Sequence, residues 1–240
     1  MIAQRGGHDV GRQVRPQGVV GRASEAVLAA GHDLRQALGP DPARDALAAR
    51  FPGAEPGQDP DQLDENRALL AELLEALPIP TIAAINGFAR AGGFELACGC
   101  DFIVIGENAK IGDAHTDAGV VPAQVTLRLR RRVGAQRAKE ILWTARWLTA
   151  REAVDIGLAL HAFPDASLLQ DTIAFARTMT DKPAAAIASL KRILVEGEDM
   201  SLAEGTELEL KYFTEYMSTQ PHGREGYYAF REKRAPRWRK

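Results

Sequence analysis

Several features that would assign a class of protein are missing from these 240 residues. No apolar run approaches the ~20 residues that a membrane-spanning helix needs, and the charged first residues lack the apolar segment of a secretory signal. Lysine and arginine (30) nearly balance aspartate and glutamate (32), and the resulting net charge of −2 argues against a general nucleic-acid or membrane-surface binder. The two cysteines, Cys98 and Cys100, cannot form a disulfide framework, so buried packing is favoured over metal or redox use. We therefore expect a cytoplasmic globular protein.

Familiar motifs of nucleotide, metal and hydrolase chemistry are also absent. The chain contains no G-x-x-x-x-G-K-[ST], H-E-x-x-H, G-x-S-x-G or G-x-G-x-x-G. Asp113, His115 and Asp117 alternate on a predicted loop, but the rest of a ligand set is not visible, so we expect no metal site. A basic cluster on a predicted helix favours a solvated helix face over a phosphate contact; its members are Arg128, Arg130, Arg131 and Arg132.

The periodicity of apolar residues divides the chain into three parts. Residues 1–16 show neither a strand nor a helix period and are expected to be disordered. Residues 17–163 mix short apolar runs with helical segments, and residues 164–240 are predominantly helical in pattern. Strands are predicted over 81–85, 102–105 and 109–112, helices over 59–77 and 93–98, and capping boxes at Thr149/Glu152 and Ser201/Glu204. The sequence therefore predicts an α/β core followed by a helical region.

Two turns in the core place glycine directly before a predicted helix, at Ala29–Gly31 and at Ala91–Gly93. Backbone N–H groups at a helix start have no partner within the helix and lie at the positive end of its dipole. Two such groups aimed at one point would form an oxyanion hole. Taken singly, each turn fits tight packing equally well.

Glu95 lies inside the second of these helices, among apolar neighbours in the sequence GGFELACG. An ionised carboxylate is costly in such surroundings. A carboxyl held there retains its proton more firmly than in water and can give or take one near neutral pH. Glu95 is therefore a candidate acid/base.

The whole segment Pro80–Asp101 resembles the signature of the crotonase family, the enoyl-CoA hydratases and isomerases. The family pattern is roughly P-x-I-A-A-x-N-G-x-A-x-G-G-G-x-E-L-A-x-x-C-D, against PTIAAINGFARAGGFELACGCD here. Three further stretches are similar to family motifs: AAGHDL at 29–34, TAREAVDIGL at 149–158, and the C-terminal EG, F and EKR between 225 and 234. The resemblance runs from about Val20 to the C-terminus.

The resemblance implies a spiral of ββα units followed by a C-terminal helical region that forms trimers. Members bind acyl-CoA thioesters, and two backbone N–H groups stabilise the enolate that forms from the thioester carbonyl. By position, these donors are Ala30 and Gly92. Glu95 matches one of two glutamates that handle the added water and its protons. No cofactor is implied beyond coenzyme A as part of the substrate.

Partners follow from the same resemblance. It implies a homotrimer or a dimer of trimers and a place in fatty acid metabolism. Phe230 and Lys233 match C-terminal residues that can reach the CoA of a neighbouring subunit.

The chain departs from the family pattern at the second glutamate, whose position is taken by His115, twenty residues after Glu95. An imidazole can also act as an acid or base, but a structural role fits equally well. Asp113 and Asp117 flank it and could orient the ring or supply a carboxylate, and His32 is a weaker accessory candidate. The usual P-G-x-G-G reads PAQVT at 122–126, which suggests a reshaped acyl pocket.

The front of the chain also departs from the pattern. Only 29 residues precede Ala30, so we expect the first ββα unit to be missing or replaced. Hydration of a 2-enoyl-CoA is the leading hypothesis. An isomerase, decarboxylase or hydrolase acting on a CoA thioester in the same site, or an inactive truncated member, remain as alternatives.

Overall fold

The computed structural model describes residues 70–238. The predicted disordered segment 1–16 and the start of the predicted helix 59–77 lie outside this range. Within it, a helix occupies residues 70–76. The strands are β1 (Ile82–Ile85), β2 (Phe88–Arg90), β3 (Phe102–Gly106), β4 (Lys110–Gly112), β5 (Leu148–Thr149) and β6 (His161–Phe163). The helices are α4 (Gly92–Gly99), the 3₁₀ turn η1 (Thr116–Ala118), α5 (Val125–Thr144), α6 (Ala150–Asp155), α7 (Leu168–Thr180), α8 (Ala184–Glu196), α9 (Leu202–Thr219) and α10 (His222–Arg231).

Within residues 70–238, two ββα units follow one another, and each sends its two strands to different sheets. The first unit is β1–β2–α4 and the second is β3–β4–α5. β1 pairs with β3 in parallel, and β6 extends that sheet on the far side of β3. β2 pairs with β4 in parallel, and β5 closes the second sheet antiparallel to β4. This repetition confirms the expected spiral of ββα units.

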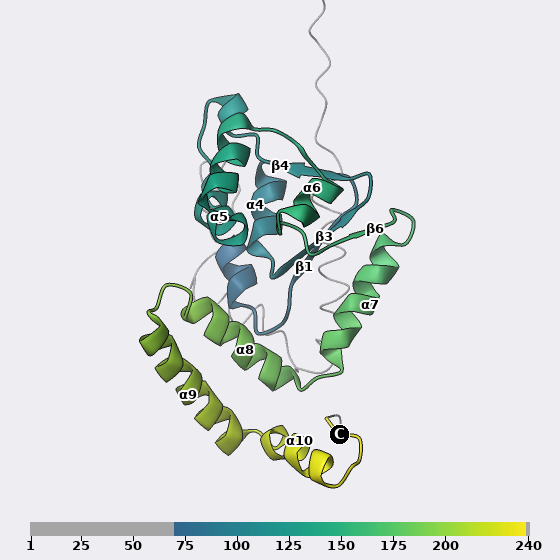
Figure 1. Cartoon of the computed structure of the whole chain (residues 1–240), viewed down its shortest axis with the longest axis vertical. Coiled ribbons are helices and arrows are strands. Elements are labelled where there is room, and N and C mark those ends of the chain that lie inside the picture. The colour runs from purple at the N-terminus through teal and green to yellow at the C-terminus, as the bar shows by residue number, and fades with distance from the viewer. Residues whose placement is uncertain (1–69, 239–240) are drawn as a thin grey trace, which may run out of the picture.

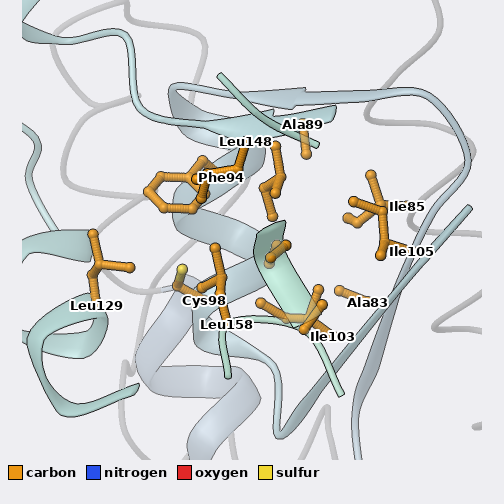
Figure 2. Close-up of a cluster of buried hydrophobic side chains, with 14 of the residues drawn as sticks. Ala83, Ile85, Ala89, Phe94, Cys98, Ile103, Ile105, Leu129, Leu148 and Leu158 are labelled. Carbon is orange, nitrogen blue, oxygen red and sulfur yellow. The ribbon is translucent and has the colours of Figure 1, made fainter. Parts of the chain in front are cut away.

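Buried side chains alternate between the two faces of the β1–β3–β6 sheet, as expected for strands covered on both sides. Ile85 and Ile105 point into the larger cluster with α4, α5 and α6, which Figure 2 shows around Phe94 and Leu129. Ile82 and Val104 point to the opposite face and pack against α7. Three strands of this fold were predicted; β2, β5 and β6 were not.

The last three helices, α8–α10, form a segment that we call the arm. Figure 1 shows α9 and α10 lying away from the α/β body, with α8 between them and it. Many large apolar side chains on the arm are exposed, among them Leu190, Leu194, Leu202, Leu210, Phe213, Tyr227 and Phe230. Both predicted capping boxes are confirmed: Thr149 caps α6, and Ser201 caps α9.

One buried lysine fastens the arm to the body. The Lys191 ammonium on α8 donates to the carbonyls of Leu74 (2.7 Å) and Ile79 (3.0 Å) and to Asp101 Oδ2 (2.8 Å). The same oxygen accepts bonds from the backbone N–H and the hydroxyl of Thr81. All three donor protons of the ammonium thus have an acceptor, which a buried charge requires. Asp101 closes the loop after α4, so this contact fixes the C-terminal end of that helix.

Candidate active site

The first backbone N–H groups of α4 have no acceptor within the helix. Ala91, the residue before the helix, has φ 49° and ψ −121°, a left-handed conformation that a side chain rarely adopts. Its carbonyl accepts the N–H groups of Phe94 (2.9 Å) and Glu95 (3.0 Å). The N–H groups of Gly92 and Gly93 have no acceptor within the helix because no turn precedes them. They lie at the positive end of the helix dipole, where an anionic oxygen is stabilised.

Glu95 lies one turn into α4 and is buried, with 7% of its surface exposed. Phe94 beside it is fully buried, as the apolar sequence predicts. Glu95 Oε1 accepts the backbone N–H of Gln124 at 3.0 Å. Among the described residues no donor bonds Oε2. One carboxyl oxygen is therefore held in place, and the other is available for proton transfer.

The pairing of β2 with β4 brings the loop after β4 next to the start of α4. Arg90, the last residue of β2, is directly opposite Gly112, the last residue of β4. The carboxyl ends of parallel strands meet at one edge of a sheet. The turn into α4 and the loop that begins with Asp113 therefore leave the sheet side by side, and the bond from Gln124 to Glu95 closes that loop over α4.

Asp113 orients the imidazole of His115. Its carboxylate is fully buried, and Oδ2 accepts the backbone N–H of His115 at 3.1 Å. Oδ1 lies 2.5 Å from the ring Nδ1. An ionised carboxylate in this position favours the proton on Nδ1, which leaves the lone pair on Nε2 when the ring is neutral. Of the two roles open for Asp113, the structure thus supports orientation of the ring.

Asp117 is engaged elsewhere. It lies on η1 and accepts a hydrogen bond from Arg90 at 2.7 Å, in an exposed ion pair. Arg90 also donates to the Ala145 carbonyl at 2.9 Å, and its guanidinium lies 4.4 Å from the centre of the Trp147 ring. This arginine, which the sequence did not single out, pins the short turn that follows His115.

The basic cluster on α5 matches the expected solvated face in part. Arg128 forms a two-pronged bond with Glu75 at 2.6 and 2.7 Å, and Arg131 pairs with Glu198 and Asp199 at 2.8 Å. Arg132 donates to the backbone carbonyls of Cys98 and Cys100 at the C-terminal end of α4. Arg130 and Arg131 are exposed, as predicted, although Arg131 also forms ion pairs. Arg128 and Arg132 are half-buried and brace α5 against its neighbours.

The remaining predicted site residues lie either outside the described range or at the end of the arm. Ala30 and His32 lie outside the described residues. Phe230 is 85% exposed on α10, and Lys233 follows that helix in a left-handed conformation. Within 70–238, no group of three or more His, Cys, Asp or Glu side chains could hold a metal ion. In the same range, no helix is both long and apolar enough to cross a membrane.

The buried thiols are unsuited to chemistry. Burial raises the pKa of Cys98 to about 12, and burial together with the Asp101 carboxylate raises that of Cys100 to about 12. Both therefore stay protonated at neutral pH, and the thiolate is the reactive form. This agrees with the packing role that the sequence favoured.

Comparisons with known proteins point to one enzyme family. The family profile described as enoyl-CoA hydratase/isomerase matches residues 13–240. The enoyl-CoA isomerase/hydratase fer4 of Mycosarcoma maydis is 37% identical over 70% of the chain and 61% of its own length. The 2,3-dehydroadipyl-CoA hydratase of Escherichia coli is 34% identical over 72% of the chain and 68% of its own length.

Solved structures of enoyl-CoA hydratases share the fold of this chain. The crystal structure of an enoyl-CoA hydratase from Bacillus anthracis superposes with a TM-score of 0.71 at 33% identity, covering 76% of the chain and 72% of that structure. The chain spans only part of the length of its curated relatives: 61% of the fungal enzyme and 68% of the bacterial enzyme above.

Proposed function

Because the chain belongs to the enoyl-CoA hydratase/isomerase family, we propose that it adds water to a 2-enoyl-CoA thioester. The observation that carries the proposal is the pairing of two features on α4. N–H groups without an acceptor in the helix lie at its start, and one turn later a buried glutamate keeps one carboxyl oxygen unbonded among the described residues. An anion-stabilising group and an acid/base are the two devices that an enolate reaction needs.

The N–H of Gly92 stabilises the thioester oxygen. In this proposal Ala30, from the segment outside the described residues, supplies the second donor. Negative charge develops on the oxygen as the enolate forms, and the helix dipole adds to the bond. One such donor is worth about 10²–10³ in rate.

Glu95 takes the proton of the attacking water. The water oxygen forms a bond to C3, the C2–C3 π electrons move toward the thioester oxygen, and the resulting enolate returns them to C2 as it takes a proton. In this step His115 starts with both ring nitrogens protonated and gives its Nε2 proton to C2, while Asp113 holds the ring through Nδ1. The proton held by Glu95 then returns to His115 through solvent, so the hydroxyl of water ends on C3 and one proton on C2, and no cofactor beyond the coenzyme A of the substrate takes part.

A second candidate function is isomerisation of a 3-enoyl-CoA. The observation that favours it is His115 in place of the second glutamate, because shifting a double bond requires proton removal and return but no water. A decarboxylase or thioester hydrolase in the same site is less directly supported. The relatives' names include both hydratase and isomerase.

We also propose that the arm assembles three chains, or two sets of three. The exposed apolar side chains on α9 and α10 support this, because monomeric proteins rarely expose large contiguous apolar patches. In such an assembly Phe230 and Lys233 would contact the CoA of a neighbouring subunit. The acyl chain and the pathway, fatty acid metabolism or another, are left open.

The test is hydration of crotonyl-CoA, followed by loss of the conjugated thioester absorbance. Glu95→Gln keeps the shape and removes the base, so kcat should fall about 10²–10⁴-fold with KM little changed. His115→Gln should lower kcat by about 10–100-fold. Wild type and Glu95→Gln that are equally inert would contradict the hydratase proposal, and 3-enoyl-CoA would then test the isomerase. Inertness toward both would support the inactive member.

A further inference from the structure

The side chain of Gln124 is buried and, among residues 70–238, has no hydrogen-bond partner. Only 8% of the residue is exposed. Within that range neither Nε2 nor Oε1 of its amide is bonded, although both atoms are enclosed. Gln124 is at the N-cap position of α5, but its side chain makes no capping hydrogen bond. Among the described residues, no other side chain leaves both ends of a polar group buried and unbonded in this way.

The backbone of Gln124 is clamped on both sides. Its N–H donates to Glu95 Oε1 at 3.0 Å, and its carbonyl accepts from Arg128 at 3.0 Å. Arg128 is itself held by the two-pronged bond with Glu75. With its main chain fixed and a side chain only three bonds long, the amide stays in the neighbourhood of the Glu95 carboxyl.

An unbonded buried amide is costly, at about 1–3 kcal/mol for each group left without a partner. Such a group in a folded protein calls for a missing partner. The amide offers one acceptor and two donors. A partner that satisfies both kinds of site must itself donate and accept, as a water molecule or a hydroxyl does and a carboxylate does not.

We propose that Gln124 holds the water that is added to the substrate. The Gln124 Oε1 accepts a hydrogen bond from one O–H of the water, while Glu95 removes the proton of the other O–H. The Gln124 Nε2 donates a hydrogen bond to the same oxygen once it has become the 3-hydroxyl of the product. The oxygen lone pair is thereby directed at C3. This inference rests on the proposed hydratase function and adds to it a group that touches the nucleophile and was not identified from the sequence.

The experiment separates water addition from proton chemistry at C2. Gln124→Met replaces the amide by an apolar side chain of similar length. Hydration of crotonyl-CoA should fall about 10–100-fold in kcat, the loss expected for one or two oriented hydrogen bonds. Exchange of the C2 protons of butyryl-CoA in D₂O needs the oxyanion hole and a base but no nucleophilic water. It should change less than about threefold.

Stability gives an independent reading. Because Gln124→Met removes an unsatisfied buried amide, its melting temperature should equal or exceed that of wild type; a lower value contradicts an amide without an internal partner. Gln124→Asn keeps the amide but withdraws it by one methylene, and it should also lose hydration while retaining exchange. If wild type hydrates and both variants hydrate equally well, or if exchange falls with hydration, the inference is wrong. If wild type exchanges protons but does not hydrate, the proposed function itself fails.

Discussion

The α/β body has a core of fully buried apolar side chains, whereas the arm buries few of its own. In the body, Phe94, Ile105 and Leu129 are fully buried against one another. On α9 of the arm, Tyr212 is the buried residue, and Leu202, Leu210 and Phe213 are more than 60% exposed. The body therefore has an apolar core of its own, although Val121 and Trp143 on its surface are exposed, whereas α9 leaves most of its large apolar side chains exposed. Residues of the body and of the arm can be substituted separately to test this difference.

The largest effect is expected on the exposed face of α9. Replacing Leu210 and Phe213 together by glutamate would place two charges in the proposed interface, and association should weaken by about 4–8 kcal/mol. Sedimentation should show a shift to monomer while circular dichroism keeps its helical signal. Lys211→Glu, an exposed polar change on the same helix, is the control. A double variant that sediments as wild type would refute assembly through this face.

The next effect is expected where body and arm meet. Lys191→Met leaves the Asp101 carboxylate without its cation and two buried carbonyls without a donor. Removing one partner of a buried ion pair costs about 3–5 kcal/mol, which should appear as a lower midpoint in urea unfolding. Lys182→Met, at an exposed lysine, serves as the control. A midpoint unchanged from wild type would mean that the arm is not fastened by this contact.

A smaller effect, of opposite sign, is expected in the turn before α4. Ala91 holds φ 49° and ψ −121°, and a residue with a Cβ is strained there. Ala91→Gly should relieve the strain and raise the free energy of unfolding by about 1 kcal/mol, after the entropy cost of glycine is subtracted. Thermal unfolding measures it, with Ala184→Gly in the first turn of α8 as a control that should lose stability. A destabilised Ala91→Gly would show that the turn is not strained.

The smallest effect is expected at the cap of α6. The N–H and hydroxyl of Thr149, with Arg146, lower the pKa of Glu152 from its ordinary value near 4.5 to about 2. A carboxyl with a depressed pKa adds stability above pH 4.5 that is lost as the pH falls toward 2. Glu152→Gln should therefore cost about 0.5–1 kcal/mol at pH 6, the carboxyl being exposed, and less at pH 3. An equal cost at both pH values would exclude the charge as the cause.

The sequence predicted the parts of this fold that depend on local pattern. β1 and β3 are continuous apolar runs, and the Thr149 and Ser201 caps follow from spacing alone. β2 escaped notice because its three residues lie between two glycine turns and only Ala89 is buried. β5 and β6 are equally short. Strands of two or three residues exist because a neighbour pairs with them, and that neighbour is not visible in local periodicity.

The candidate site divides in the same way. Glu95 could be identified because its charge contrasts with its immediate neighbours. Asp113 and Asp117 both lie two residues from His115, so spacing could not decide between them. The fold decides, because Asp113 follows β4 into the interior while Asp117 is on η1 and faces Arg90. Gln124 and Lys191 depend on contacts across 29 and 90 residues, which no local pattern reports.

The two ends of α4 set a limit on how the chain length can vary. The helix begins at the turn that presents the Gly92 N–H and ends at Gly99, two residues before Asp101, whose Oδ2 accepts bonds from Thr81 and Lys191. One inserted residue would rotate everything after it by about 100° and lengthen the helix by about 1.5 Å. Either Glu95 would lose its contact with Gln124, or Asp101 would lose its bonds to Thr81 and Lys191. Insertions should therefore be tolerated in the loops around this helix and excluded within it.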